Sequence, residues 1–243
     1  MTKVFEFSKR NLKELIRDPL SLVFSFGLPI FLLIIFNQFK IPSEVYELKN
    51  FAPGMIVFSY AFLSLFTATL ISKDRSSSFL TRLYASPLTP IQFVLGYIFA
   101  LIPISILQSI LFFMVSILLG LTFSINIILT IFILIPVSIL FISLGILIGC
   151  LVGDKAAPGV SSIVIQLVAF TSGLWFDINT VGGVIKVLSI VLPFSHSLDL
   201  TRYSLAGQYD KIFISLLIVI IYIIISFKVA FLVFKKKMQS DNK

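Results

Sequence analysis

Few residues of this chain could do covalent or acid–base chemistry, and they lie far apart. The sequence has one cysteine, Cys150, and one histidine, His196, which excludes a disulfide framework and a metal site built from several thiolates or histidines. The scattered acidic residues form no catalytic constellation, and no GxxxxGK[ST] phosphate-binding loop occurs. The sequence therefore predicts a protein that is not an enzyme and binds no cofactor. Energy for any active transport must come from another polypeptide.

The composition is that of a membrane protein. Hydrophobic residues make up 58% of the chain and charged residues 12%, whereas soluble domains average about 25% charged residues. The mean hydropathy is +1.08. The net charge of +8 comes from basic residues beside apolar segments, without the interleaved aromatic residues of a nucleic-acid-binding module. We predict an all-α polytopic protein of the lipid bilayer, with no nucleic-acid partner.

The chain begins with an amphipathic segment at residues 2–17. Apolar residues fall on one side at helical spacing, and lysine, arginine and glutamate fill the other, a pattern typical of a helix lying in the membrane interface. Asp18 and Pro19 then end the helix and turn the chain into the bilayer. Six apolar segments that follow are near the roughly 20 residues needed to cross it: 20–36, 51–72, 93–119, 127–152, 157–176 and 212–234.

The distribution of lysine and arginine predicts the orientation. With both termini in the cytosol, thirteen of the 19 basic residues lie in inside segments, five lie outside, and Lys228 lies within the last span. Because basic residues are enriched in cytosolic loops, we expect both termini inside and the protein in the cell membrane. No predicted span carries a charged residue at mid-depth, which disfavours an ion-coupled carrier.

The polar segment 73–92 (KDRSSSFLTRLYASPLTPIQ) separates two spans on the predicted cytosolic side. Ser76, Ser77 and Ser78 offer side-chain oxygens to the free N–H groups of a starting helix, and Pro87 and Pro90 end it. We predict a short helix here. It is either an ordinary cytosolic connection or a docking helix for a soluble partner.

A second unusual segment is residues 181–193 (VGGVIKVLSIVLP), which is apolar but too short to cross the bilayer. We predict a re-entrant or interfacial segment that contains Gly182 and Gly183 and ends at Pro193. After it, His196 is either a contact to substrate at the outer mouth or a hydrogen-bonded histidine. Asp199 and Arg202, three residues apart, predict an ion pair on a helix surface.

Three glycines recur every four residues near the end of the fourth span: Gly145, Gly149 and Gly153. Such spacing lets two helices approach closely. The partner helix is either a second subunit or another span of the same chain.

The order of these features resembles the permease subunit of type-2 ABC exporters over most of the chain. In the cytosolic segment the resemblance rests on Leu80, Arg82, Leu83, Ser86 and Pro87, and the sequence differs where the family usually has glycine (Ser78) and often has glutamate (Thr81). A second patch, from TSGLWFDINT to VLPFSHSLDLTRYSLAG, matches the family pattern at Ser172, Gly173, Phe176, Pro193, Asp199, Arg202 and Gly207.

The resemblance implies a dimer of permeases, as a homodimer or heterodimer, that moves a substrate outward along the interface between its two copies. It also implies a cytosolic ABC ATPase that binds ATP and Mg²⁺ and contacts each permease at the cytosolic helix, through Ser78, Phe79, Leu80, Arg82, Leu83, Tyr84 and Pro87. The apolar interior favours a hydrophobic or amphipathic substrate.

Two other classes of protein remain open from the residues alone. An ATP-independent secondary carrier or channel also has spans without a nucleotide site, but it needs polar residues inside the membrane. A membrane-embedded enzyme needs a catalytic constellation. An ATPase that co-purifies with the chain favours the exporter, and activity of the purified chain without ATP favours the alternatives.

The basic-residue distribution gives a testable topology. In sealed right-side-out vesicles, protease should leave residues 235–243 intact, because the membrane protects cytosolic segments. The same protease should remove them once the vesicles are opened. Cleavage of this tail in sealed vesicles would contradict the orientation.

Overall fold

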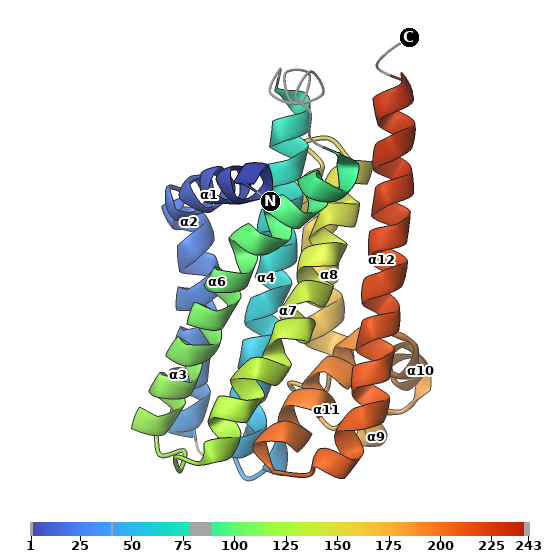
Figure 1. Ribbon diagram of the computed structural model, residues 1–243. Coiled ribbons are helices and arrows are strands. Elements are labelled where there is room, and N and C mark those ends of the chain that lie inside the picture. The colour runs from blue at the N-terminus through green and yellow to red at the C-terminus, as the bar shows by residue number, and fades with distance from the viewer. Residues whose placement is uncertain (1, 40, 78–88, 241–243) are drawn as a thin grey trace.

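The computed structural model describes residues 2–39, 41–77 and 89–240, and all regular structure among them is helical (Figure 1). The confirmed class is therefore an all-α polytopic membrane fold. The helices are α1 (Thr2–Ile16), α2 (Pro19–Leu22), α3 (Leu28–Phe39), α4 (Leu48–Ser76), α6 (Pro90–Leu118), α7 (Ile125–Leu151), α8 (Ala157–Thr171), α9 (Ile178–Val181), α10 (Gly183–Val191), α11 (Pro193–Leu205) and α12 (Ile212–Ser240). A π-helical turn, Val23–Gly27, joins α2 to α3.

Five helical segments in the described part of the chain are long and apolar enough to cross a membrane: Pro19–Phe39, Leu48–Ser76, Ile91–Leu118, Ile125–Leu151 and Tyr209–Val233. The bent pair α10 and α11 makes a sixth if it is counted as one span. The predicted span at 157–176 is shorter in the structure, because α8 has 15 residues, about 22 Å of helix. Its helix ends before Gly173, whose positive φ of 82° breaks the helical path.

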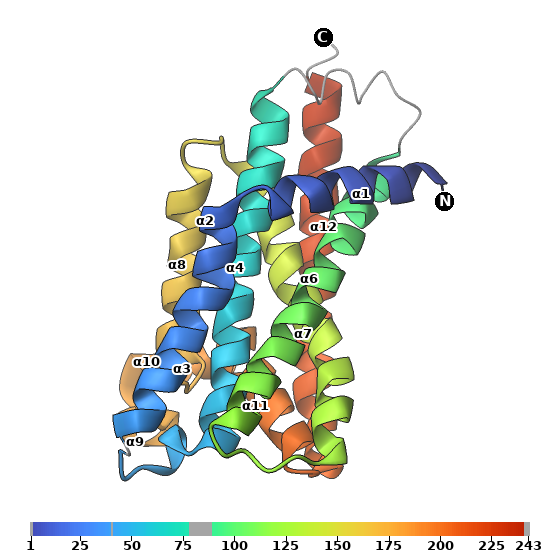
Figure 2. The same cartoon turned by 90° about the vertical axis from the view of Figure 1, so that its left-hand side faces the viewer.

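The long helices run side by side, and α4 is at the centre of the bundle. Of the most apolar part of α4, 89% is buried inside the protein, against 17% for the segments around α3 and α12. Helix α1 lies across one end of the bundle, where α4 and α12 also end (Figure 2). We call this the α1 end. Helices α9, α10 and α11 lie at the opposite end.

The structure corrects the boundaries of the predicted cytosolic segment 73–92. Helix α4 continues to Ser76, so the first residues of that segment extend the second span. The hydroxyls of Ser76 and Ser77 donate to the carbonyls of Lys73 and Asp74 (both 3.0 Å). They therefore bind the end of α4 instead of the start of a new helix, because the carbonyls of the last helical turn lack partners within the helix.

The other end of the segment belongs to α6. This helix begins at Pro90 with a capping box, in which Thr89 and Gln92 each bond the other's backbone N–H. The predicted coupling residues lie between α4 and α6, outside the described residues: Ser78, Phe79, Leu80, Arg82, Leu83, Tyr84 and Pro87.

The predicted re-entrant segment, 181–193, starts at the last residue of α9 and contains α10, and the helical chain continues beyond its predicted end. Gly182 and Gly183 have positive φ of 65° and 57° at the α9–α10 junction. Pro193 does not end the segment but begins α11, at a bend of 73° from α10. The reason is that proline suits the first turn of a helix, where its missing N–H costs no hydrogen bond.

The recurring glycines lie against α4 of the same chain. A Cβ at Gly145 would come within 2.5 Å of the Ser64 carbonyl oxygen, and one at Gly149 within 2.9 Å of the Ala68 carbonyl oxygen. Gly153 follows the end of α7 and has no atom within 4 Å of its Cβ position. Of the two alternatives from the sequence, the structure places the first two glycines in packing within one chain.

This contact predicts that a glycine-to-alanine substitution affects stability differently at Gly145 and at Gly159. Gly145→Ala should lower the free energy of unfolding by about 1–3 kcal/mol, since the added methyl group meets backbone of α4 that cannot rotate away. Gly159→Ala on α8, where nothing lies within 4 Å, should be neutral or slightly stabilising. Thermal unfolding in detergent measures both. Equal free energies of unfolding for the two variants would contradict the close packing of α7 on α4 at Gly145.

Candidate functional site

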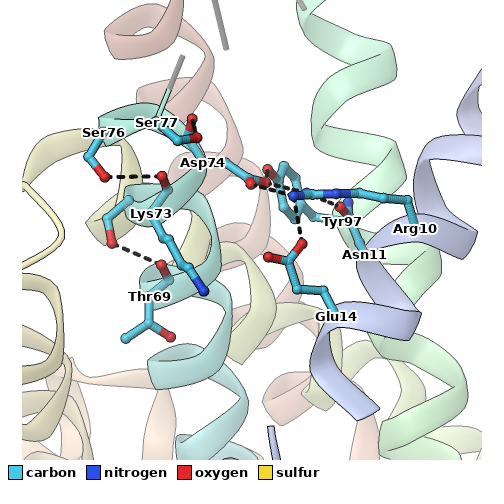
Figure 3. Close-up of polar contacts among 10 residues, drawn as sticks. Arg10, Asn11, Glu14, Thr69, Lys73, Asp74, Ser76, Ser77 and Tyr97 are labelled. Atoms are coloured by element: carbon cyan, nitrogen blue, oxygen red, sulfur yellow. Dashed lines mark hydrogen bonds and ion pairs between the residues drawn. The ribbon is translucent and has the colours of Figure 1, made fainter. Parts of the chain in front are cut away.

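A buried carboxylate lies in the last turn of α4, next to the predicted coupling segment. Asp74 is 2% exposed, and both of its oxygens bind Arg10 of α1, at 2.7 and 2.8 Å (Figure 3). Tyr97 of α6 donates its hydroxyl to the same carboxylate at 2.6 Å. Two oxygens and a planar guanidinium make a bidentate pair, the strongest form of this interaction. Three helices thus meet at one side chain.

Arg10 is held by further contacts on α1. It lies 2.6 Å from Glu14 and 2.9 Å from the side-chain oxygen of Asn11. Burial by itself would lower the pKa of Arg10, but the hydrogen bond and charge of Asp74, with the charge of Glu14, outweigh it and raise the pKa. The guanidinium therefore stays charged where it lies 2.7 Å from the Asp74 carboxylate.

Aromatic packing also joins α1 to α6 next to this contact. The ring of Phe7 on α1 stacks on Phe93 (centroids 5.5 Å apart) and meets Tyr97 edge-on (5.2 Å). Gly96 lies directly under Phe7, where any Cβ would collide with the ring. Such ring pairs contribute about 0.5–1.5 kcal/mol each beyond burial of area. Apolar and ionic contacts therefore fix α1 on α6 together.

The next residue of α4 binds a different helix. Arg75 donates to the carbonyl oxygens of Gly149 and Cys150 (2.6 Å each) and Val152 (3.2 Å) at the end of α7. These carbonyls carry the negative end of the helix dipole, so a cation there is favourable. Asp74 and Arg75 consequently tie the last turn of α4 to α1, α6 and α7. We call Arg10, Asp74, Arg75 and Tyr97 the α4-end cluster.

The contacts of the α4-end cluster hold α1, α4, α6 and α7 together, and we assign them no catalytic role. The cluster fixes the residues that precede the segment 78–88, and the capping box of α6 fixes those that follow. Sequence reasoning missed this cluster. Its only signal was that Asp74 is the single acid among the basic residues of the segment 73–92, and its partner Arg10 lies 64 residues away.

A polar cavity of about 590 Å³ lies at the opposite end of the bundle, between α9, α10, α11 and the start of α4. The second patch from the sequence gathers here, because Ser172, Gly173, Phe176, Asp199 and Arg202 all line it. The patch is split along the sequence, and only the fold of α8 to α11 brings its parts together.

Two polar residues of this cavity have contacts of their own. His196 lines the cavity and lies 3.1 Å, through Nε2, from the carbonyl of Ile190. Arg202 donates to the carbonyls of Asn50 (3.1 Å) and Gly173 (3.2 Å). Asp199 and Arg202 attract each other electrostatically, but among the described residues they do not come within the contact distance of the predicted ion pair. The guanidinium instead spans the gap between the start of α4 and the end of α8.

Comparison with known proteins adds one match. The family model described as ABC-2 type transporter matches residues 2–206. The matched range includes α1, the α4-end cluster and the polar cavity. No curated protein matches the chain in sequence.

The contact between Arg10 and Asp74 predicts unequal costs for removing one charge or the other. Arg10→Ala leaves the Asp74 carboxylate buried without a cation and should cost about 3–5 kcal/mol of unfolding free energy. Asp74→Asn should cost less, because the Arg10 side chain is 34% exposed and keeps Glu14.

The double variant Arg10→Ala/Asp74→Asn should recover part of the loss, since no buried charge is left. Thermal unfolding in detergent measures all three. Lys49→Ala, which breaks the exposed pair with Glu47, is the control and should change stability by less than about 1 kcal/mol. A double variant as unstable as the sum of the single variants would contradict the pair.

Proposed function

The chain belongs to the ABC-2 type transporter family, and we propose that this multi-pass permease exports a hydrophobic or amphipathic substrate from the cytosol. The energy comes from a separate ABC ATPase subunit, which binds the ATP and Mg²⁺. In this proposal the α1 end faces the cytosol, the chain lies in the cell membrane, and two permease copies form the transport unit.

The observation that carries the proposal is the anchoring of both ends of the segment 78–88. A permease without its own nucleotide site needs a contact through which a partner's movement reaches the spans. On the side of α4, Asp74 and Arg75 connect the segment to three other helices over contacts of 2.6–3.2 Å. A force applied to the segment would therefore act on α1, α6 and α7 together.

The interior supports a substrate of low polarity. Helix α7 lines its buried side with residues such as Leu134, Leu140, Phe141 and Ile146. Many polar side chains inside the bundle bond to backbone carbonyls or to one another, as Ser105 does to Ser138 (3.0 Å). Exposed side chains of α3 and α12, such as Phe31, Ile214 and Ile221, are apolar as well, so a free sugar or an ion would meet few polar partners on the outside of these helices.

Replacement of one predicted coupling residue tests the proposal. If Phe79, Leu80, Leu83 and Tyr84 form the apolar face that contacts the ATPase, Leu83→Asp places an unpaired charge in that contact. The variant should reach the membrane at the normal level, but it should neither retain an ATPase on purification nor stimulate ATP hydrolysis. Ser78→Ala should be milder, because loss of a helix cap costs about 0.5–2 kcal/mol.

Leu118→Asp is the matched control, since it makes the same change at a leucine that is 84% exposed at the far end of α6. This variant should keep its ATPase. Wild-type ATPase binding and export by Leu83→Asp would remove the coupling role of the segment. Transport by the purified chain without ATP would favour a secondary carrier or channel.

A further inference from the structure

Helix α1 carries two neighbouring rows of side chains on its outer surface. One row is apolar and consists of Leu12, which is half-buried, and Ile16, which is 57% exposed. The other row is basic and consists of Lys9, Lys13 and Arg17, all exposed. Lys13 and Arg17 directly follow Leu12 and Ile16 in the sequence, so the two rows are about 100° apart around the helix axis. The two rows therefore run side by side.

The apolar row borders a groove of about 710 Å³ between α1, the start of the first span and α6. Two irregularities in the helices lie along it, the π-helical turn Val23–Gly27 and the proline inside α6. Both interrupt regular helix geometry, and π-helical turns often accompany functional sites. The groove is lined by apolar residues, among them Leu12, Ile16, Val23, Gly27, Pro103 and Leu107.

The basic row borders a second recess, of about 620 Å³, on the polar side of α1. Arg10 and Glu14 also line it, but they bind each other and Arg10 binds Asp74. Within the described part of the chain, no ion pair engages Lys9, Lys13 or Arg17. Three cations thus face this recess against one further acid, Glu6.

We propose that this surface binds one anionic phospholipid of the leaflet that α1 borders. The phosphate group lies against Lys13 and Arg17, with Lys9 beside them, and an acyl chain lies in the apolar groove. Charge complementarity selects the head group, and the adjoining groove requires a molecule with an apolar tail. A second permease copy fits poorly, because a two-fold axis through this surface would set the same three cations against each other.

Titration of the purified, delipidated full-length protein in detergent tests the site. Native mass spectrometry would count retained lipids as phosphatidylglycerol or phosphatidylcholine with the same acyl chains is added. Phosphatidylglycerol should bind at least about tenfold more tightly, at one molecule per chain. Lys13→Gln/Arg17→Gln should weaken its binding roughly 10- to 30-fold, since each cation near an anionic head group contributes a factor of about five.

A second variant fills the groove without touching a charge. The nearest atom to a Cβ at Gly27 is Val23 Cγ1, at 3.7 Å, so Gly27→Leu can extend into the groove without a backbone clash. It should weaken binding of both lipids. Gly159→Leu, at a helical glycine with no atom within 4 Å, and Lys211→Gln, on the exposed turn before α12, are the controls and should bind like the wild type.

Several results would overturn the site. Equal affinity for the two lipids would reduce it to a non-specific lipid contact, and unchanged binding in Lys13→Gln/Arg17→Gln would place the head group elsewhere. Displacement of phosphatidylglycerol by inorganic phosphate alone would indicate a free-anion site. Loss of a permease dimer in Gly27→Leu, with unchanged lipid binding, would assign the groove to a second copy.

Discussion

The α1 end of this protein depends on a single buried charge. A carboxylate that is 2% exposed must be neutralised nearby, and Asp74 meets this need with a guanidinium from α1 and a hydroxyl from α6. Because these partners come from different helices, satisfying one charge also fixes the position of α1 across the bundle. Arg75 joins the end of α7 to the same cluster through its bond to the Gly149 carbonyl. Helix α1 is thereby part of the bundle and not merely attached to its surface.

The rest of the bundle follows from the lack of water in a membrane. Many polar side chains inside it find partners in backbone carbonyls or in one another, as Tyr60 does in Ser109 and the Gln108 amide nitrogen does in Ser25, since an unpaired polar group is costly in hydrocarbon. An apolar side chain gains little free energy by moving from lipid to the protein interior, because both surroundings are apolar. Close packing must therefore hold the helices together. The contact of α7 with α4 through Gly145 and Gly149 supplies such packing.

The two ends of the molecule differ in ways that suit a coupled transporter. At one end, ionic contacts among α1, α4, α6 and α7 surround the predicted coupling segment. At the other, short helices and positive-φ glycines enclose a polar cavity. The chain is a member of the ABC-2 type transporter family. Through the lipid surface proposed on α1, the bilayer would also act on the α4-end cluster.

The sequence by itself determined the all-α membrane class and pointed to the family, because hydropathy and helical periodicity are local properties that each segment carries alone. It also located a short apolar segment before the last span. Only the tertiary structure decided that Asp74 is buried against Arg10, that Arg202 binds carbonyls and not Asp199, and that Gly145 packs within the chain. Each of these depends on a partner far away in the sequence, and residue type alone does not say which distant group will fill a buried position.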